Sequence, residues 1–397
     1  MHSLKEFISL NPIENFSDYF SLGRKIEKSC NDNMLAPEKT LNIALLASST
    51  INGMKETIQV LCAEYDIFGK IYVGEYNQYA QEILNTESRL YESNPDLVII
   101  NIDTRTIASD YFITPYSISL EERQEWVQKT VDFISNLAEK VMKNMVAKAI
   151  LHNLEVPIYS PHGLVENKEE YGFIESLQDV NRTLRDRFKG DSKVYVFDYD
   201  SFCSRLGKDN VFDYKMYYMG DIKLKPKYFP LLGMEYTRYI QALVASTKKC
   251  IVLDLDNTIW GGVVGEIGLE GIQLGPTPEG RPFLEFQQYL LSLFNRGIIL
   301  AINSKNNLED ALEVIKKHPH MSLKEKHFAA MRINWNDKVQ NMRSLSEEIN
   351  IGLDSLVFFD DDPLNRDLVK EFLPEVTVVD LPKDPSLYVK TLMNLNF

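Results

Sequence analysis

Short apolar runs alternate with longer amphipathic segments along the chain, and this alternation constrains the fold more than any other feature. The runs have the length of buried strands, and the segment 121–144 between two of them carries apolar residues at helical spacing. Strands that alternate with helices form parallel sheets covered by helices on both faces. We therefore expect an α/β fold. The predicted strands are 41–47, 70–73, 97–102, 146–151 and 194–197, with helices over 54–64, 121–144 and 173–188.

The alternation restarts in the second half of the chain, which predicts a second domain. A chain of 397 residues is longer than one compact domain usually is. A predicted helix over 230–246 precedes a new apolar run at 250–255. We expect two three-layer domains with parallel sheets, 1–245 and 246–397, and a helical extension over about the first 35 residues. In the second domain we predict a strand over 250–255, a hairpin over 257–275, a helix over 279–295, a strand over 298–302, a further helix, and strands over 356–359 and 376–379.

Charge and cysteine content exclude several classes of protein. The chain has 43 Lys and Arg residues against 57 Asp and Glu residues, and this net charge of −14 repels nucleic acid and anionic membranes. The four cysteines form no CxxC pair, so we expect neither a disulfide framework nor a thiolate metal site. No apolar run reaches the roughly 18 residues of a membrane span, and charge interrupts the N-terminal segment, unlike a signal peptide. We expect a reduced, cytoplasmic protein.

Two carboxylates come directly after the first predicted strand of the second domain. The apolar run 251–253 leads into Asp254, and Asp256 comes two residues later. Because side chains alternate along a strand, both carboxylates begin on the same side, with Leu255 opposite. This arrangement suits a nucleophile with a general acid/base beside it.

A similar pair, Asp198 and Asp200, comes after the predicted strand 194–197 in the first domain. The two pairs differ in the residues that come after them in the chain. We interpret the first-domain pair as turn-forming residues at a strand end, because no further polar elements of a site accompany it.

Three further polar elements come after the pair in the second domain. Each stands where a predicted strand ends or a helical pattern begins. They are Ser304, Lys338, and the neighbours Asp360 and Asp361. The carboxyl-end loops of an open parallel sheet converge on one crevice, so we expect these side chains to meet at one site.

Such a site meets the needs of phosphoryl transfer, which are positioning and electrostatic stabilisation. A carboxylate that attacks a phosphate suffers repulsion between anions, so a divalent cation is needed between them, and oxygen ligands favour Mg²⁺. We predict metal ligation by the carboxylates of Asp254 and of Asp360 or Asp361, and by the backbone carbonyl of Asp256.

Taken in order, these elements resemble the four motifs of the haloacid dehalogenase (HAD) superfamily. The resemblance implies a Rossmann-like α/β fold and phosphate-ester hydrolysis through an aspartyl-phosphate. It implies that Asp254 is the nucleophile and Asp256 the acid/base. We expect Lys338 to neutralise charge on the phosphate and the nucleophile, and Ser304 to hydrogen-bond a phosphoryl oxygen.

The segment around Trp260-Gly261-Gly262 is similar, more narrowly, to the subfamily IIIC, FkbH-like branch. Those proteins remove phosphate from a glycolytic bisphosphoglycerate and hand the glyceryl group to a carrier-protein thiol. They carry a cysteine just before the Ser-Lys-Asn motif, where this chain has Asn303, and an amide cannot hold a thioester. Cys250, the nearest thiol in sequence, is about 13 Å from Asp254 along a strand.

These observations favour a HAD phosphatase that acts on a phosphorylated metabolite or a carrier-linked substrate. The alternative functions are an FkbH-like glyceryl transferase that loads an acyl carrier protein, and a non-catalytic scaffold. A carrier protein and a second copy of the chain remain open as partners. Only 50 residues separate Asp254 from Ser304, and 34 separate Ser304 from Lys338, so neither gap holds a large cap domain.

The first domain resembles flavodoxin-like folds of the SGNH hydrolase type. Its first predicted strand ends at Ser48 and Ser49, where those enzymes carry a nucleophilic serine in a Gly-Asp-Ser turn, but the Gly and Asp are absent here. The segment 210–234 contains no histidine to act as a base. We interpret both serines as helix-capping residues and the domain as a binding or docking module.

Overall fold

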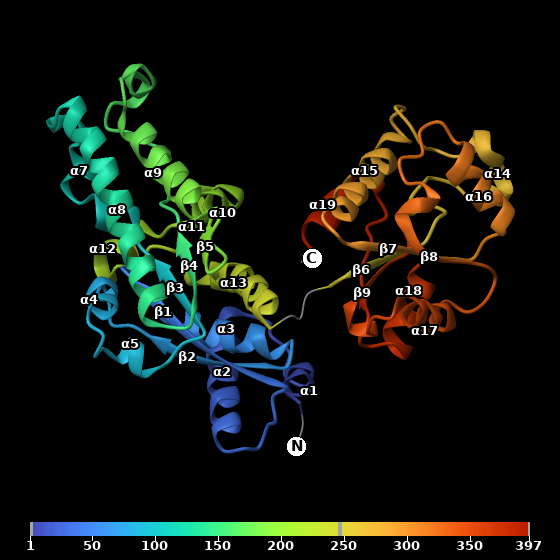
Figure 1. Cartoon of the computed structure of the whole chain (residues 1–397), viewed down its shortest axis with the longest axis horizontal. Helices are drawn as coiled ribbons and strands as arrows, with labels where there is room; N and C mark the ends of the chain where they lie inside the picture. The colour runs from blue at the N-terminus through green and yellow to red at the C-terminus, as the bar shows by residue number, and fades with distance from the viewer. Residues whose placement is uncertain (1–2, 245–247, 396–397) are drawn as a thin grey trace. The chain divides into compact units, whose positions relative to one another are not determined.

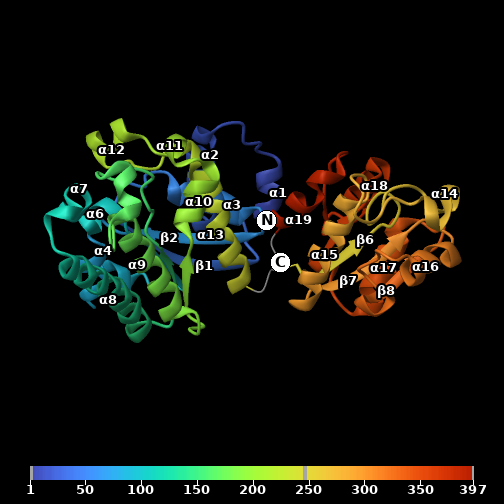
Figure 2. The ribbon, with the colours of Figure 1, turned by 90° about the horizontal axis from the view of Figure 1, so that it is seen from above.

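The computed structural model of the chain describes residues 3–244 and 248–395. The chain divides into two compact units, Met1–Ile240 and Gln241–Phe397 (Figure 1). The domain boundary predicted between residues 245 and 246 lies outside the described residues. Each unit has its own parallel sheet (Figure 2), so the predicted α/β class with two parallel sheets is confirmed.

The sheet of the first unit has five parallel strands in the order β2-β1-β3-β4-β5. The apolar runs form this sheet because both of its faces are covered, as in β1, where every residue from Ile43 to Ala47 is buried. The predicted strands of this unit are therefore confirmed. Their bounds are β1 Lys39–Ala47, β2 Ile67–Val73, β3 Leu97–Asn101, β4 Lys148–His152 and β5 Val194–Phe197.

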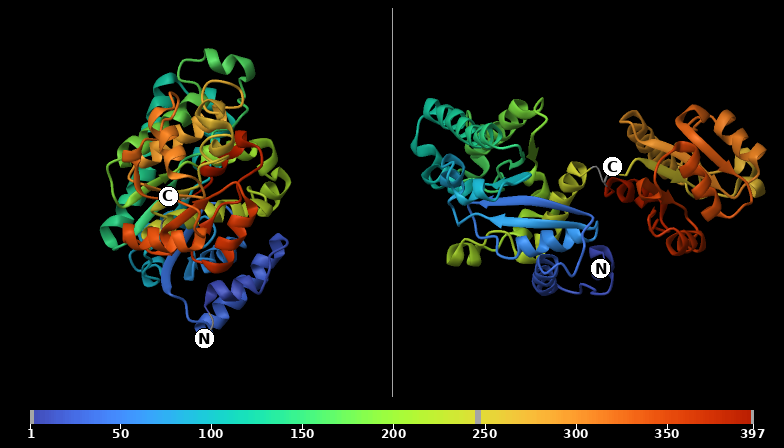
Figure 3. Two further views of the ribbon diagram at one scale, coloured as in Figure 1. Left: turned by 90° about the vertical axis from the view of Figure 1, so that its right-hand side faces the viewer. Right: turned by 60° about the horizontal axis from the view of Figure 1, so that its bottom comes forward.

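Helices cover both faces of this first sheet (Figure 3). Ala44 and Leu46 of β1 belong to one core with α8 and α9. Leu45 points to the opposite face and lines a small cavity with Met54 of α3 and Leu232 of α13. Because neighbouring residues of a strand face opposite sides, β1 is buried between the two helical layers. The bounds are α3 Met54–Ala63, α8 Leu120–Asn144, α9 Phe173–Phe188 and α13 Phe229–Leu243.

Two helices precede the first sheet, in the segment for which a helical extension is predicted. They are α1, Leu4–Ser9, and α2, Phe16–Asn31, and Leu22 and Ile26 of α2 pack in one cluster with Val60 of α3. The remaining α-helices of this unit are short. They are α4 Tyr79–Leu84, α5 Arg89–Glu92, α6 Thr104–Ala108, α7 Asp110–Ile113, α10 Tyr199–Leu206, α11 Lys208–Val211 and α12 Tyr214–Gly220.

The sheet of the second unit also has five parallel strands, in the order β10-β9-β6-β7-β8. The first strand in sequence, β6, lies in the centre, with β7 on one side and β9 on the other. The strand order reverses there, and such a point is where open α/β sheets bind their ligands. The bounds are β6 Cys250–Leu253, β7 Ile299–Ser304, β8 Phe328–Ile333, β9 Leu356–Phe359 and β10 Thr377–Val378.

The structure differs from the sequence analysis at two places in this unit. Strand β8 was not predicted, because its Ala329, Ala330 and Met331 are good helix formers and it lies at an edge of the sheet. The predicted hairpin over 257–275 is wrong in its middle. Gly261 and Gln273 do form an antiparallel bridge, but the chain between them folds into the short helix α14, Val264–Gly271.

Helices cover both faces of the second sheet as well. Ile251 and Leu253 of β6 pack in one core with Phe286 of α15, whereas Cys250 and Val252 pack in another with Met342 and Leu345 of α17. The bounds are α15 Arg281–Asn295, α16 Leu308–Lys317, α17 Lys338–Ile349, α18 Pro363–Phe372 and α19 Tyr388–Met393. Among the helices of the described residues, none combines the length and the apolar composition that a bilayer crossing requires.

A histidine is buried at the carboxyl end of β4 in the first unit. His152 is 1% exposed, and a hydrogen bond of 2.9 Å joins its Nε2 to the hydroxyl oxygen of Tyr236. The rings of Phe197, Tyr199 and Tyr236 surround the imidazole. Burial lowers the pKa of His152 to about 3.

This low pKa predicts that acid destabilises the first unit. The unfolded state takes up a proton near pH 6.5 and the folded state does not, so stability is full above that pH and falls below it. Between pH 7 and pH 4.5 the wild-type chain should lose about 2–3 kcal/mol more than the His152→Gln variant in denaturant titrations. The exposed His320 supplies a control, since His320→Gln should keep the wild-type pH dependence. Identical pH dependence in His152→Gln would contradict the assignment.

Candidate active site

The site begins at the carboxyl end of the central strand β6. Asp254 directly follows Leu253, and its backbone N–H donates to the carbonyl oxygen of Phe359 at 2.9 Å, so the pairing of β6 with β9 continues to this residue. Asp254 and Leu255 are buried, and Asp256 is half-buried. The sheet therefore fixes the backbone from which the first carboxylate projects.

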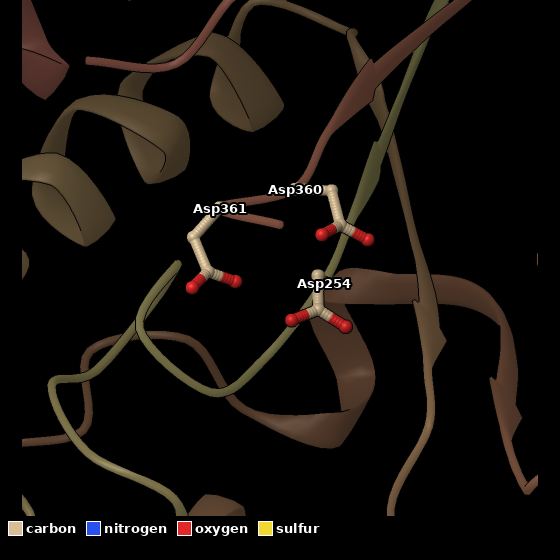
Figure 4. A group of neighbouring side chains, drawn as sticks. All are labelled: Asp254, Asp360 and Asp361. Atoms are coloured by element: carbon tan, nitrogen blue, oxygen red, sulfur yellow. The ribbon is translucent and has the colours of Figure 1, made fainter. Parts of the chain in front are cut away.

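Asp360 and Asp361 come directly after β9, the neighbour of β6. One carboxylate oxygen from each of Asp254, Asp360 and Asp361 lies within 4.8 Å of the others (Figure 4). Burial and the nearby Asp254 raise the pKa of Asp360, and burial together with Asp254 and Asp360 raises the pKa of Asp361 to about 6. Three carboxylates at this spacing repel one another.

This carboxylate group fits a hard divalent cation. Mg²⁺ prefers oxygen ligands and usually takes one or two carboxylates together with waters. The separation of up to 4.8 Å is close to the roughly 4 Å between opposite ligands of one Mg²⁺ ion. Asp254, Asp360 and Asp361, all predicted as ligands, are thus brought together. The side chain of Asp256 is not part of this group, and ligation through its backbone carbonyl stays a prediction.

Lys338 is the cation that the chain itself places against these carboxylates. It is the first residue of α17, and its side chain is 3% exposed. Its Nζ donates to Oδ1 of Asp254 and to Oδ2 of Asp360, both at 2.5 Å. Burial alone would lower the pKa of Lys338, but the carboxylates of Asp254 and Asp360 outweigh it and raise the pKa above its usual range. The ammonium is therefore fully charged at neutral pH.

Asn303 holds Lys338 in this position. The carbonyl oxygen of Asn303 accepts from Lys338 Nζ at 3.0 Å, and the Asn303 amide donates to the Lys338 backbone carbonyl at 3.0 Å. Its amide oxygen accepts from Asn341 at 3.1 Å. The role of Asn303 was not predicted, because the sequence analysis noted only that it replaces the cysteine of FkbH-like proteins. Its position at the end of a buried strand could have indicated that it faces the site.

Asp256 lies in a separate set of hydrogen bonds. Its Oδ1 accepts from the Trp260 indole at 2.8 Å and from the Val264 backbone at 3.2 Å, and its Oδ2 accepts from the Asn306 amide at 2.9 Å. Burial raises the pKa of Asp256, although these donors oppose the shift. The contacts of Trp260 and Asn306 were not predicted, but both residues lie in loops that leave the carboxyl ends of β6 and β7.

Ser304 ends β7 at the same edge of the sheet. Leu253 pairs with Ile302, so Ser304 lies just beyond the level of Asp254. Its side chain is buried, and in the part of the chain that the structure describes no hydrogen bond joins its hydroxyl to Asp254 or Lys338. Among the described residues, Ser304 thus lies at the same sheet edge as Asp254 without a hydrogen bond to the carboxylate group.

A cleft of about 600 Å³ adjoins the carboxylates. Asp361 and Asn257 line it, together with Arg366, Lys383 and Tyr388. The Arg366 guanidinium donates to the backbone carbonyls of Asp360 and Asp361 at 2.8 and 2.7 Å, which fixes the loop after β9. The cleft has the size of a small-molecule site.

In the first unit the structure corrects the role given to Ser48 and Ser49. The residue that precedes helix α3 is Gly53, so neither serine caps that helix. The buried Ser48 hydroxyl instead accepts a hydrogen bond from the Asp103 backbone at 2.7 Å. Asp198 behaves as predicted for a turn-forming residue, since it caps α10 by accepting from the Ser201 backbone. The same prediction is wrong for Asp200, which lies within α10 and accepts from the Val156 backbone at 2.7 Å and from Lys208 at 2.6 Å.

Comparison with known proteins gives two substantial similarities. The family model described as "FkbH, N-terminal domain" matches residues 42–240. A crystal structure of the N-terminal part of the protein BF1531 from Bacteroides fragilis, described as containing a phosphatase domain and complexed with Mg, is 30% identical. It has a TM-score of 0.86 and covers 97% of this chain and 99% of its own. No curated protein matches the chain significantly.

Two further solved structures are much less similar. They are the lipase Lip_vut3 from a goat rumen metagenome and an acetyl xylan esterase called AlAXEase, each 12% identical and covering 50% of this chain. They cover 96% and 100% of their own chains, with TM-scores of 0.38 and 0.33. Similarity at this level supports no conclusion about the first unit.

The contacts of Lys338 predict a large effect of its removal on stability. A Lys338→Gln variant leaves two buried carboxylates without their cation, and breaking a buried ion pair in this way costs about 3–5 kcal/mol. We expect the second unit of the metal-free variant to lose about that much free energy of unfolding in denaturant titrations.

Lys305→Gln is the matched control for this prediction. Lys305 is exposed, and its Nζ donates to the Asn365 side chain at 3.3 Å, so its loss should cost less than about 0.5 kcal/mol. A loss below about 1 kcal/mol for Lys338→Gln would mean that the buried ion pairs do not hold the site together.

Proposed function

This chain belongs to the FkbH family, and from this premise we propose that it is a Mg²⁺-dependent phosphohydrolase of the HAD type that acts through an aspartyl-phosphate. The observation that carries the proposal is the buried contact of Lys338 with Asp254 and Asp360, beside Asp361. The Mg complex and phosphatase domain of the similar Bacteroides fragilis chain support the same metal and activity. We assign the substrate to phosphorylated metabolites or carrier-linked phosphate esters.

The proposed metal ligands are the carboxylates of Asp254, Asp360 and Asp361 and the backbone carbonyl of Asp256. When bound, Mg²⁺ supplies positive charge that weakens the repulsion between a carboxylate nucleophile and a phosphate. Three carboxylates face one ammonium group, so the site carries excess negative charge that favours a cation.

Asp254 is the proposed nucleophile. The hydrogen bond from Lys338 to its Oδ1 restricts rotation of the carboxylate and orients it at the carboxyl end of β6. A carboxylate oxygen forms a bond to phosphorus while the phosphorus–oxygen ester bond of the substrate breaks. Lys338 offsets negative charge on the phosphoryl oxygens in this step, and Ser304 is proposed to hydrogen-bond one of them.

Asp256 is the proposed acid/base. Its raised pKa allows it to carry a proton, which it gives to the alkoxide that leaves the phosphorus. It then takes a proton from the water that attacks the phosphorus of phospho-Asp254. This second attack releases inorganic phosphate and restores the carboxylate of Asp254. The hydrogen bonds from Trp260 and Asn306 fix the orientation of the Asp256 carboxylate for these proton transfers.

Glyceryl loading of an acyl carrier protein is the second candidate function, and the match to an FkbH family model favours it. The residue at the expected thiol position is Asn303, which is buried and bonded to Lys338 and Asn341. Cys250 lies at the opposite end of β6 from Asp254 and is buried as well. Hydrolysis therefore needs fewer assumptions than acyl transfer.

Asp254→Asn should reduce phosphate release from a panel of sugar phosphates by at least about 1,000-fold, because the amide is a poor nucleophile. The control is Asp198→Asn, which changes the similar carboxylate pair in the first unit and should leave turnover within about twofold of wild type. A wild-type rate of phosphate release in Asp254→Asn would contradict the assignment of Asp254 as the nucleophile.

Chelation of divalent cations should abolish the same activity, and added Mg²⁺ should restore it. Asp361→Asn should weaken Mg²⁺ binding, measured by calorimetry, by at least about tenfold, since a charged ligand becomes neutral. Asp362→Asn is the matched control, because the side chain of this next residue caps α18 by accepting from the Leu364 backbone at 3.0 Å, a role that Asn also fills. Equal Mg²⁺ affinity in both variants would contradict the ligand assignment.

Hydrolysis and loading differ in their products. Bisphosphoglycerate incubated with the protein and a phosphopantetheinylated carrier should release phosphate without changing the mass of the carrier. A glyceryl adduct on the carrier, detected by mass spectrometry, would establish the second candidate function instead. If no phosphate ester yields either free phosphate or a glyceryl adduct, the chain is a non-catalytic scaffold.

A further inference from the structure

A pocket in the first unit lies at the carboxyl ends of β3 and β4. Its volume is about 290 Å³, close to the lower limit for small-molecule sites. Arg105 comes after β3, the segment 155–159 comes after β4, and residues within 208–223 close the wall. Ligands of open α/β sheets bind outside the carboxyl ends of the strands, so the pocket occupies the position of a binding site.

Six aromatic residues line the pocket. They are Phe112, Tyr159, Phe212, Tyr214, Tyr217 and Tyr218. Several rings reach far into solvent, since Tyr218 is 72% and Tyr159 69% exposed. An apolar ligand that covers these faces removes them from water, which favours its binding.

Two lysines at the pocket are already paired with carboxylates. Lys223 donates to Asp103 and, at 3.1 Å, to Glu155. Lys208 donates to Asp200 at 2.6 Å and lies 4.0 Å from Glu155. Burial alone would lower the pKa of Lys223, but Asp103 and Glu155 raise it, so this network stays charged and rigid. These ammonium groups are therefore neutralised by carboxylates of the protein and are not available to pair with a ligand.

Arg105 differs from the two lysines. Its guanidinium lies over the rings of Phe112, Tyr217 and Tyr218, at 5.7, 5.5 and 5.1 Å from their centroids, and it donates to the Tyr218 hydroxyl at 3.0 Å. Within residues 3–244 and 248–395, no carboxylate forms an ion pair with it. The rings hold the guanidinium plane while most of its N–H groups remain available at the pocket wall.

From these contacts we propose that the pocket binds a small organic acid with a single carboxylate and an apolar or aromatic body. The carboxylate pairs with Arg105, and the body lies against the tyrosine and phenylalanine rings. The planar guanidinium matches the two oxygens of a carboxylate. This site lies in the first unit and is independent of the proposed phosphatase activity.

The same geometry disfavours a phosphate group at this pocket. A phosphate dianion needs several cationic donors, whereas Lys208 and Lys223 are occupied by Asp200, Asp103 and Glu155. Glu155 and Asp213 also line the pocket and repel a second negative charge. One carboxylate is the anion that a single unpaired guanidinium balances.

The test is calorimetric titration of the full chain with 3-phenylpropanoate. We expect saturable binding with a Kd of roughly 0.1–1 mM, typical of a ligand of this size. The neutral 3-phenylpropanamide should bind at least about tenfold more weakly, because it cannot form the charged pair. Inorganic phosphate should not displace 3-phenylpropanoate.

Substitutions locate the site. Arg105→Gln should weaken 3-phenylpropanoate binding by at least about tenfold, and Arg105→Lys by about threefold, since it keeps the charge but loses the planar fork. Lys215→Gln is the matched control, because Lys215 lies on α12 beside the pocket without lining it, and its removal should change the Kd less than twofold. Asp254→Asn should also bind normally, which separates this pocket from the phosphatase site.

Several results would overturn the proposal. They are no binding of 3-phenylpropanoate at about 10 mM, equal affinity for the amide, displacement by phosphate, or unchanged affinity in Arg105→Gln. Loss of binding in Asp254→Asn would place the ligand in the second unit. The comparison of acid and amide uses the wild-type chain, so it decides the charge requirement even if Arg105→Gln folds poorly.

Discussion

The Lys338 ammonium between Asp254 and Asp360 is the interaction on which the second unit depends. It joins the start of α17 to the end of β9, 22 residues later in the chain, and to the end of β6, 84 residues earlier. Buried charges are stable only when they are paired, so this contact constrains how the sheet and α17 pack. The third carboxylate, Asp361, is close to both acids and leaves the group with excess negative charge. Because three carboxylates share one ammonium group, the site still favours a further cation.

Much of this site could be predicted from the sequence because strand geometry is local. Parallel-sheet topology predicted that Lys338, Asp360 and Asp361 would join Asp254 at one edge of the sheet. The period of two predicted that Asp256 would begin on the same side, but its carboxylate lies in a separate set of hydrogen bonds. The contact of Asn306 was not predictable in the same way, since an amide in a loop carries no periodic signal, whereas Asn303 lies within β7 and its buried strand position could have indicated that it faces the site. Strand β8 was missed because Ala and Met favour helices and only tertiary pairing with β7 makes this segment a strand.

The first unit places polar groups at the same kind of edge but uses them differently. Its lysines Lys208 and Lys223 are each bound by carboxylates, which leaves a rigid network beside aromatic rings. The second unit instead gathers more carboxylates than cations around Lys338. Two sheets of the same class thus present different chemistry at their carboxyl ends. The first-unit strands were predicted from the sequence, but one wall of the pocket comes from residues 208–223, whose short helices show little periodicity.

The central claim is that Asp254 receives the phosphoryl group, and its covalent state can be measured directly. The protein is mixed with a phosphate ester in the presence of Mg²⁺, quenched in acid and reduced with borohydride, which converts an acyl phosphate into an alcohol. Peptide mass spectrometry then identifies which Asp or Glu side chain has been reduced to the alcohol. The account predicts reduction at residue 254 that depends on both substrate and Mg²⁺. A labelled carboxylate elsewhere, or turnover with Asp254 unmodified throughout, would contradict it.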